Sequence, residues 1–236
     1  MSARAAHPQI SSSISGRPPL SEPDLARSAL YSEELGIRLR DGSERELFKW
    51  FLASLLFGGR ISETIARNTY RAFVRHRLLT ARAILRAGHD TLVYPVMHEG
   101  GYVRYDESKS TQIARDCQML AAEYQGRLTR LHATASGPAD LEERLQRFYG
   151  VGAITANIFL RELRPFWPKA DPEPLAPVRD LARAWGIDLA RHDRKSLAFA
   201  RLEAGLVRAL HRQDYVRKPA VAHASRTRVT ARGAPA

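Results

Sequence analysis

The sequence predicts an all-α protein, and three observations lead to that prediction. Apolar residues recur at helical spacing in nearly every segment between residues 25 and 215. Serine or threonine precedes several of these segments and glycine follows several, as is typical of helix ends. No segment alternates apolar and polar residues like a half-buried strand. With 236 residues and 44% hydrophobic content, the chain can bury one sizeable core or two small lobes that share a cleft.

The expected helices follow one another along this region. Ser43 can cap a helix through "ERELFKWFLASLLFG", whose dense apolar positions predict the central buried helix. Ser62 opens a helix through "ETIARNTYRAFVRH", and Thr80 opens a shorter one. Ser108 precedes "KSTQIARDCQMLAAEYQG", which Gly126 closes.

Two helices and two terminal segments complete the predicted organisation. Pro177 can start "PVRDLARAWG", Gly186 ends it, and the helical pattern "RKSLAFARLEAGLVRALHR" follows. Residues 1–24 are rich in serine and proline and are predicted to be disordered. Residues 216–236 resemble them but are basic, which predicts a disordered basic tail. One helical domain is therefore expected over residues 25–215.

A helical hairpin is expected around "YGVGAITAN", residues 149–157. Upstream, "DLEERLQRFYG" offers Asp140 as an N-cap, and downstream "AITANIFLREL" repeats the helical pattern. The Gly-Val-Gly turn can bury Val151 between the two helices. Gly150 and Gly152 are either plain helix caps or bare backbone that presents N–H groups to a phosphate at the second helix's N-terminus. The second interpretation makes the hairpin a nucleic-acid contact.

Charge and cysteine content narrow the function classes. The formal charge of +12 favours a polyanionic partner, with a solvated basic surface as the alternative. The single cysteine, Cys117, excludes an internal disulfide and a cysteine-ligated cluster, and its apolar surroundings predict a core position. The eight histidines lack zinc-site spacing, so no metal site is expected. No apolar stretch approaches the roughly 20 residues of a membrane span, which predicts a cytoplasmic protein.

The stretch "VYPVMHEGGYVRYDESK" interrupts the helical rhythm with a proline and two adjacent glycines. It is expected to be a loop or a short helix with a glycine turn. Its tyrosines Tyr94, Tyr102 and Tyr105 either pack on the core or line a pocket that stacks a base.

Taken together, these motifs resemble the helix-hairpin-helix (HhH-GPD) DNA glycosylase superfamily, which includes endonuclease III. In that family the hairpin reads roughly Leu-Pro-Gly-Val-Gly-x-Lys-Thr-Ala. The positions kept in "FYGVGAITA" are Gly150, Val151, Gly152, Thr155 and Ala156. "LFKWFLASLLFGGRIS" is similar to the family's buried helix and minor-groove loop, and "KSTQIARDCQMLAAEYQGRL" to the helix before the hairpin. The resemblance spans about residues 40–190 and implies a two-lobed helical fold that binds double-stranded DNA and flips a base into the interlobe cleft.

The resemblance also implies particular DNA contacts. The hairpin contacts would come from Gly150, Val151, Gly152, Ile154 and Thr155. Aligning "GGRIS" with the family's Gln-Gln-Ile-Ser pattern puts Arg60 where a side chain fills the space left by the flipped base. An arginine on a solvated loop is the alternative. The stretch from Tyr94 to Tyr105 would be a wall of the base pocket, without identifying the base.

For catalysis, the resemblance implies hydrolysis without lyase action. Bifunctional members use a lysine two residues after the second glycine to form a Schiff base, and here that position holds Ile154. Asp171 lies 17 residues further on, near the spacing of the family's catalytic aspartate, or else caps the turn in "DPEP". Lys169 stays open as a relocated amine, and Asp180 and Glu173 as replacement carboxylates.

The expected cofactor set is empty, because the four C-terminal cysteines of iron–sulfur members are missing. A monovalent cation at the hairpin stays open. The expected partner is double-stranded DNA bound by a monomer, associated with the nucleoid in a bacterium. One rival hypothesis is a non-catalytic helix-hairpin-helix DNA-binding protein. The other is an unrelated helical bundle with a similar glycine turn.

Overall fold

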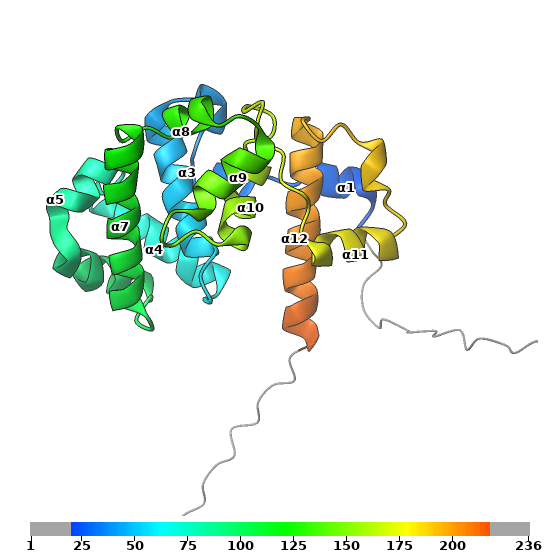
Figure 1. Ribbon diagram of the computed structural model, residues 1–236. Coiled ribbons are helices and arrows are strands. Elements are labelled where there is room, and N and C mark those ends of the chain that lie inside the picture. Colours follow the sequence, from blue (N-terminus) through cyan, green and yellow to red (C-terminus); the bar gives the residue numbers. More distant parts are fainter. Residues whose placement is uncertain (1–19, 218–236) are drawn as a thin grey trace, which may run out of the picture.

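The computed structural model describes residues 20–217, and its regular elements are all helical (Figure 1). The α-helices are α1 (Glu22–Ala26), α2 (Tyr31–Glu34), α3 (Glu44–Phe57), α4 (Glu63–Arg75), α5 (Ala81–Thr91), α6 (His98–Gly100), α7 (Asp106–Tyr124), α8 (Leu128–Thr134), α9 (Pro138–Gln146), α10 (Ala153–Arg161), α11 (Ala176–Ala184) and α12 (Leu197–Arg217). Short 3-10 turns span Leu39–Asp41 and Leu189–Arg191, and a π-helical turn spans Leu92–Met97. Residues 20–217 contain no strand, so the all-α prediction is confirmed for this part of the chain.

The helices form two groups in Figure 1: α3 to α10 on one side, and α1, α11 and α12 on the other. Within the larger group, α3 is the central helix and packs against α4, α8 and α10. The indole N–H of its fully buried Trp50 donates to the carbonyl of Phe159 in α10 at 3.0 Å. The ring of Phe51 meets the rings of Phe148 and Phe159 edge-on at 5.3 and 5.5 Å. The predicted central buried helix is therefore confirmed.

The smaller group brings the two ends of the described chain together. α1 and α11 both pack against α12. A buried carboxylate fixes the chain where the groups meet: Glu162, directly after α10, accepts the backbone N–H groups of Tyr31 at 2.8 Å and Ser32 at 3.0 Å. Burial raises the pKa of this carboxyl, and the two N–H donors offset part of its desolvation.

Both predicted domain boundaries fall inside helices. The disordered segment was expected to reach residue 24, but α1 already begins at Glu22, because the Ser21 hydroxyl accepts the N–H of Asp24 and the fully buried Leu25 anchors the turn. Serine and proline are typical of disorder and also of helix starts, which explains the error. The basic tail was expected from residue 216, but α12 continues to Arg217. Residues 1–19 and 218–236, for which disorder was predicted, lie outside the described part, so that prediction stays untested there.

The predicted N-cap residues are correct for some helices and wrong for others. Ser43 and Ser62 cap α3 and α4 as predicted, each hydroxyl accepting an N–H in the first turn. α7 begins at Asp106 rather than after Ser108, whose hydroxyl donates to the carbonyl of Tyr105 instead. α9 begins at Pro138 with Gly137 as its N-cap, so Asp140 is not the cap. None of the helices in residues 20–217 is long and apolar enough to cross a bilayer.

A candidate nucleic-acid interface at the hairpin

The predicted hairpin is present between α9 and α10. Phe148 and Val151 are buried in the core and fix the connection to the larger helix group. Gly152 is the N-cap of α10 in extended backbone geometry, with φ −92° and ψ −180°. A Cβ atom on Gly152 would meet no heavy atom within 4 Å. The surface around this glycine is open, and the first N–H groups of α10 have no acceptor within their own helix.

The first glycine of the hairpin has a role that neither alternative predicted. The Gly150 N–H donates to both carboxylate oxygens of Asp116 on α7, at 3.2 Å each. A Cβ atom on Gly150 would lie 2.7 Å from Asp116 Oδ2, so only glycine allows this approach. Burial raises the pKa of Asp116 to about 6, against the lowering effect of the Gly150 and Tyr149 N–H groups and of Lys109. The N–H assigned to a phosphate at Gly150 is thus occupied within the protein.

A groove of about 740 Å³ runs along the hairpin. Four parts of the chain line it: hairpin residues 148–155, residues 58–60 after α3, the tyrosines Tyr102 and Tyr105, and polar side chains of α7 and α9. The groove therefore unites most of the predicted site, including Arg60. Its lining contains the cations Arg60 and Lys109 and no aspartate or glutamate. This charge pattern is complementary to a polyanion.

The three tyrosines predicted for the base pocket differ in their exposure and in whether they line the groove. Tyr105 is exposed and lines the groove. Tyr102 lines it but is buried in the core, and its hydroxyl lies 3.0 Å from where a Gly59 Cβ atom would be. Tyr94 is exposed outside the groove, with its ring 5.5 Å from that of His98. Tyr102 thus packs on the core, which was the first alternative, and Tyr105 is the exposed tyrosine of the three that lines the groove. Stacking on a base stays a prediction, and Tyr94 fits neither alternative.

Two of the predicted hairpin contacts have packing roles instead. The side chain of Thr155 is buried against Gly58, where an added Cβ atom would lie only 2.0 Å from Thr155 Oγ1. Val151 is buried between the helices, as the sequence predicted for packing. Ile154, by contrast, is exposed in the first turn of α10 and lines the groove.

Sequence reasoning missed the floor of the groove, which α7 supplies. Lys109 is buried, and its Nζ donates to the carbonyl of Leu55 near the end of α3 at 3.3 Å. Burial lowers the pKa of Lys109. Gln112 also lines the groove, and Asp116 lies one turn further along the same helix. The spacing of Lys109, Gln112 and Asp116 could have indicated this role. Residues three and four positions apart share a helix face, and here that face also carries the apolar Ile113.

Asp171 lies outside the groove. It lines a second cavity of about 510 Å³, next to the start of α9. The Asp171 Oδ1 atom accepts the Nε–H of Arg194 at 3.0 Å and lies 3.6 Å from Nε of the buried Arg164. Arg194 also pairs with Glu173. The charge of the proposed catalytic carboxylate is therefore already compensated. Gln146 lines both cavities, so the two adjoin there.

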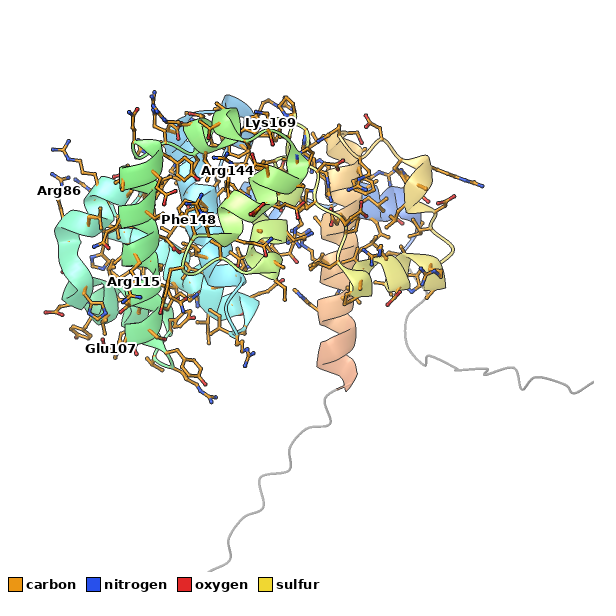
Figure 2. All side chains as sticks on the ribbon, in the orientation of Figure 1. Arg86, Glu107, Arg115, Arg144, Phe148 and Lys169 are labelled. Carbon is orange, nitrogen blue, oxygen red and sulfur yellow. The ribbon has the colours of Figure 1, made fainter. Side chains whose placement is uncertain are left out.

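The alternative site residues occupy other surroundings. The Lys169 ammonium donates to the carbonyls of His132 and Ala133 at 3.0 Å each, at the end of α8. Figure 2 shows Lys169 at the top of the larger helix group and Glu107 of α7 at its bottom, and Lys169 lines neither cavity. Asp180 is exposed on α11 and pairs with Arg183 at 3.0 Å. The Lys169 amine is therefore not placed beside either cavity.

The groove offers open backbone, two cationic side chains and exposed tyrosine rings. These are the kinds of group that suit a phosphate or the face of a base. Residues 20–217 contain no group of three or more histidine, cysteine, aspartate or glutamate side chains placed to hold a metal ion. Cys117 is buried, and burial raises the pKa of its thiol. No protein-family model, curated protein or solved structure matches the chain. Any functional conclusion therefore rests on the residues themselves.

Proposed function

We propose that this protein binds double-stranded DNA through the hairpin groove and acts there as a helix-hairpin-helix (HhH-GPD) type DNA glycosylase without lyase action. One observation carries the proposal: the groove combines open backbone at Gly152 with cationic lining and no carboxylate. A DNA phosphate would lie at the N–H groups of Ala153 and Ile154, where the α10 dipole favours negative charge. Arg60, exposed at the groove edge, would enter the space left by a flipped base.

The proposed reaction is hydrolysis of the N-glycosidic bond. Water adds its oxygen to the sugar carbon C1′, and the base leaves with a proton. Asp171 would orient the water and stabilise positive charge on the sugar, because its cavity adjoins the groove at Gln146. The ion pair between Asp171 and Arg194 must loosen for the carboxylate to do so.

A second candidate function is DNA binding without catalysis. The observation that favours it is the same ion pair, since a carboxylate neutralised by Arg194 and Arg164 stabilises a sugar cation weakly. In this case the groove would hold DNA, and the ion pairs beside Asp171 would serve only to connect the two helix groups.

Substitution at Gly152 tests the binding site. Gly152→Val places a branched side chain where phosphate must approach, so affinity for all duplex sequences should fall about tenfold in fluorescence anisotropy titrations. Gly137→Val is a matched control, because Gly137 is also an N-cap in extended geometry with no heavy atom within 4 Å of an added Cβ, yet lies outside the groove lining. Unchanged duplex binding by a folded Gly152→Val protein would remove the groove from consideration.

A strand-cleavage assay tests the reaction. Duplexes carrying different damaged or modified bases should release the base from one of them and leave an intact abasic strand, which breaks only after added alkali. Borohydride added during turnover should trap no protein–DNA adduct, because Ile154 occupies the amine position and Lys169 is held at α8. An adduct would contradict the absence of lyase action. Binding without base release from any duplex would establish the second candidate.

A further inference from the structure

Two exposed tyrosines on the groove each pair with an arginine. The Arg104 guanidinium lies over the Tyr105 ring, 5.0 Å from its centroid, and the Arg115 guanidinium lies over the Tyr149 ring at 4.6 Å. Tyr105 is 55% exposed and Tyr149 is 60% exposed, and both line the groove. A guanidinium over one face of a ring leaves the other face for a ligand and keeps a positive charge beside it.

The backbone of Tyr149 is fixed by the residues directly before and after it. The preceding residue, Phe148, is buried, and its ring packs against those of Phe51 and Tyr124. The following residue, Gly150, donates its N–H to the fully buried carboxylate of Asp116. The ring is thus presented outward from a fixed backbone, which lowers the entropy lost when a ligand stacks on it.

Helix α7 connects the two tyrosine–arginine pairs. Tyr105 is its N-cap, with a left-handed φ of 67° that a residue other than glycine rarely adopts, and Arg115 lies further along the same helix (Figure 2). The same helix contributes Asp116, which anchors the hairpin beside Tyr149. One rigid element therefore sets the positions of both aromatic rings along the groove.

We infer that these two pairs stack the bases of unpaired nucleotides, so that the groove prefers DNA containing a short single-stranded bulge over fully paired DNA. The inference rests on the proposed function, because it specifies the DNA that the hairpin groove binds. In a paired duplex each base is covered by its neighbours, and only an unpaired base can offer its face to a tyrosine. A clamp for phosphates alone needs no exposed aromatic side chain, whereas base stacking beside cations is the usual mode of binding unpaired strands.

The test compares two DNAs that differ only in a short bulge. Fluorescence anisotropy should show the bulged duplex binding about tenfold more tightly than the paired duplex, as expected from stacking of one base. Tyr149→Ala and Tyr105→Ala should each reduce affinity for the bulged duplex more than for the paired one. Tyr149→Phe keeps the ring and should keep the preference. Tyr94→Ala is the matched control, because Tyr94 is 71% exposed but lies outside the groove.

A stacking readout separates this inference from the proposed function. 2-Aminopurine in the bulge should lose fluorescence on binding, and Tyr149→Ala should prevent that loss while Tyr94→Ala does not. Equal affinity for bulged and paired DNA, with both weakened by Gly152→Val, would overturn the stacking role and leave the DNA-binding groove intact. Tighter binding of a bulged RNA of the same sequence would overturn the assignment to DNA. Failure of every nucleic acid to bind would overturn both proposals.

Discussion

The hairpin groove and the cavity beside Asp171 adjoin at Gln146, yet their linings carry opposite charge. The groove contains Arg60 and Lys109 without a carboxylate. The cavity contains four carboxylates and no cationic lining residue: Glu142, Glu143, Asp171 and Glu173. This charge pattern would favour a polyanion in the groove over the cavity. If the proposed reaction takes place at Asp171, the carboxylate would therefore act on an uncharged part of the nucleotide, the sugar, while the phosphates stay in the groove.

Two of the cavity's carboxylates, Asp171 and Glu173, have their charge compensated by arginines that do not line the cavity. Arg194 pairs with both Asp171 and Glu173. Arg164 is buried, pairs with the buried Glu203 on α12 and lies 3.6 Å from Asp171. The cavity thus doubles as a junction between the two helix groups. Burial raises the pKa of Glu142, which has Asp171 and Glu173 as further like charges nearby.

The largest expected effect is on catalysis at the cavity. Asp171→Asn keeps the shape of the side chain and removes the charge that would stabilise the sugar cation, so base release should fall at least about a hundredfold. Duplex binding in the groove should not change. The measurement is single-turnover base release, with alkali to reveal the abasic strand. Glu143→Gln is the control, because Glu143 lines the same cavity.

Persistence of base release in Asp171→Asn would mean that the catalytic carboxylate has been placed wrongly. Glu173 would then be the next candidate, because it lines the same cavity and shares Arg194. Asp180 lines neither cavity, so a loss of release in Asp180→Asn would argue for a structural effect through its surroundings on α11.

The second effect concerns the two hairpin glycines. Gly150→Ala forces a Cβ atom to within 2.7 Å of Asp116 Oδ2 and should lower the free energy of unfolding by roughly 1–3 kcal/mol. Gly152→Ala meets no atom within 4 Å at an ordinary φ of −92°, so its stability should change by less than about 0.5 kcal/mol. Thermal unfolding of both variants checks the difference. Equal stability would show that α7 can move away from Gly150.

Much of the fold could be predicted from the sequence because helix caps and periodicity are local. Ser43, Ser62 and Pro177 marked helix starts correctly. The errors arose where a residue has a partner that its motif does not indicate. Asp140 has the chemistry of an N-cap, but its carboxylate accepts the N–H of Ser136 from inside the first turn of α9. Gly150 fits a phosphate clamp by motif, but its N–H meets a carboxylate 34 residues earlier in the chain.

The candidate site was predicted only in part, because some of its residues belong to local motifs and others depend on distant partners. Arg60, Tyr105 and Ile154 could be grouped by their motifs, and the structure brings them together along one groove. Asp171 could not be placed from its spacing, because the position of its loop depends on Arg194, which lies 23 residues further along the chain.

The third effect is a pH dependence of stability that Asp116 causes. Burial raises the pKa of Asp116 in the folded protein to about 6, above the value of about 3.9 expected in the unfolded chain. Between these values the folded state binds more protons, so this residue's contribution to stability falls as the pH rises from about 4 to about 6. The Asp116→Asn variant lacks that contribution. Its free energy of unfolding, taken relative to the unsubstituted protein at each pH, should therefore rise across this range.

Denaturant unfolding at several pH values measures that difference. Glu123→Gln is a control on the same helix, because Glu123 is partly exposed and pairs with Arg147 at the surface. A difference curve for Asp116→Asn that is flat between about pH 4 and 6 would show that Asp116 stays ionised in the folded protein, with the Gly150 and Tyr149 N–H groups and Lys109 offsetting the cost of burial.

The smallest expected effect is that of Arg60 at the groove edge. If Arg60 touches a phosphate, Arg60→Ala should lower the slope of log K against log salt concentration by about 0.9. If it fills the space of the flipped base, the fluorescence change of 2-aminopurine in a lesion duplex should fall by more than the affinity does, because the extruded state loses its support. Arg86→Ala is the control, since Arg86 is exposed on α5, far from the hairpin in Figure 2. Equal losses of affinity and fluorescence would make Arg60 an ordinary phosphate contact and confine the groove to binding.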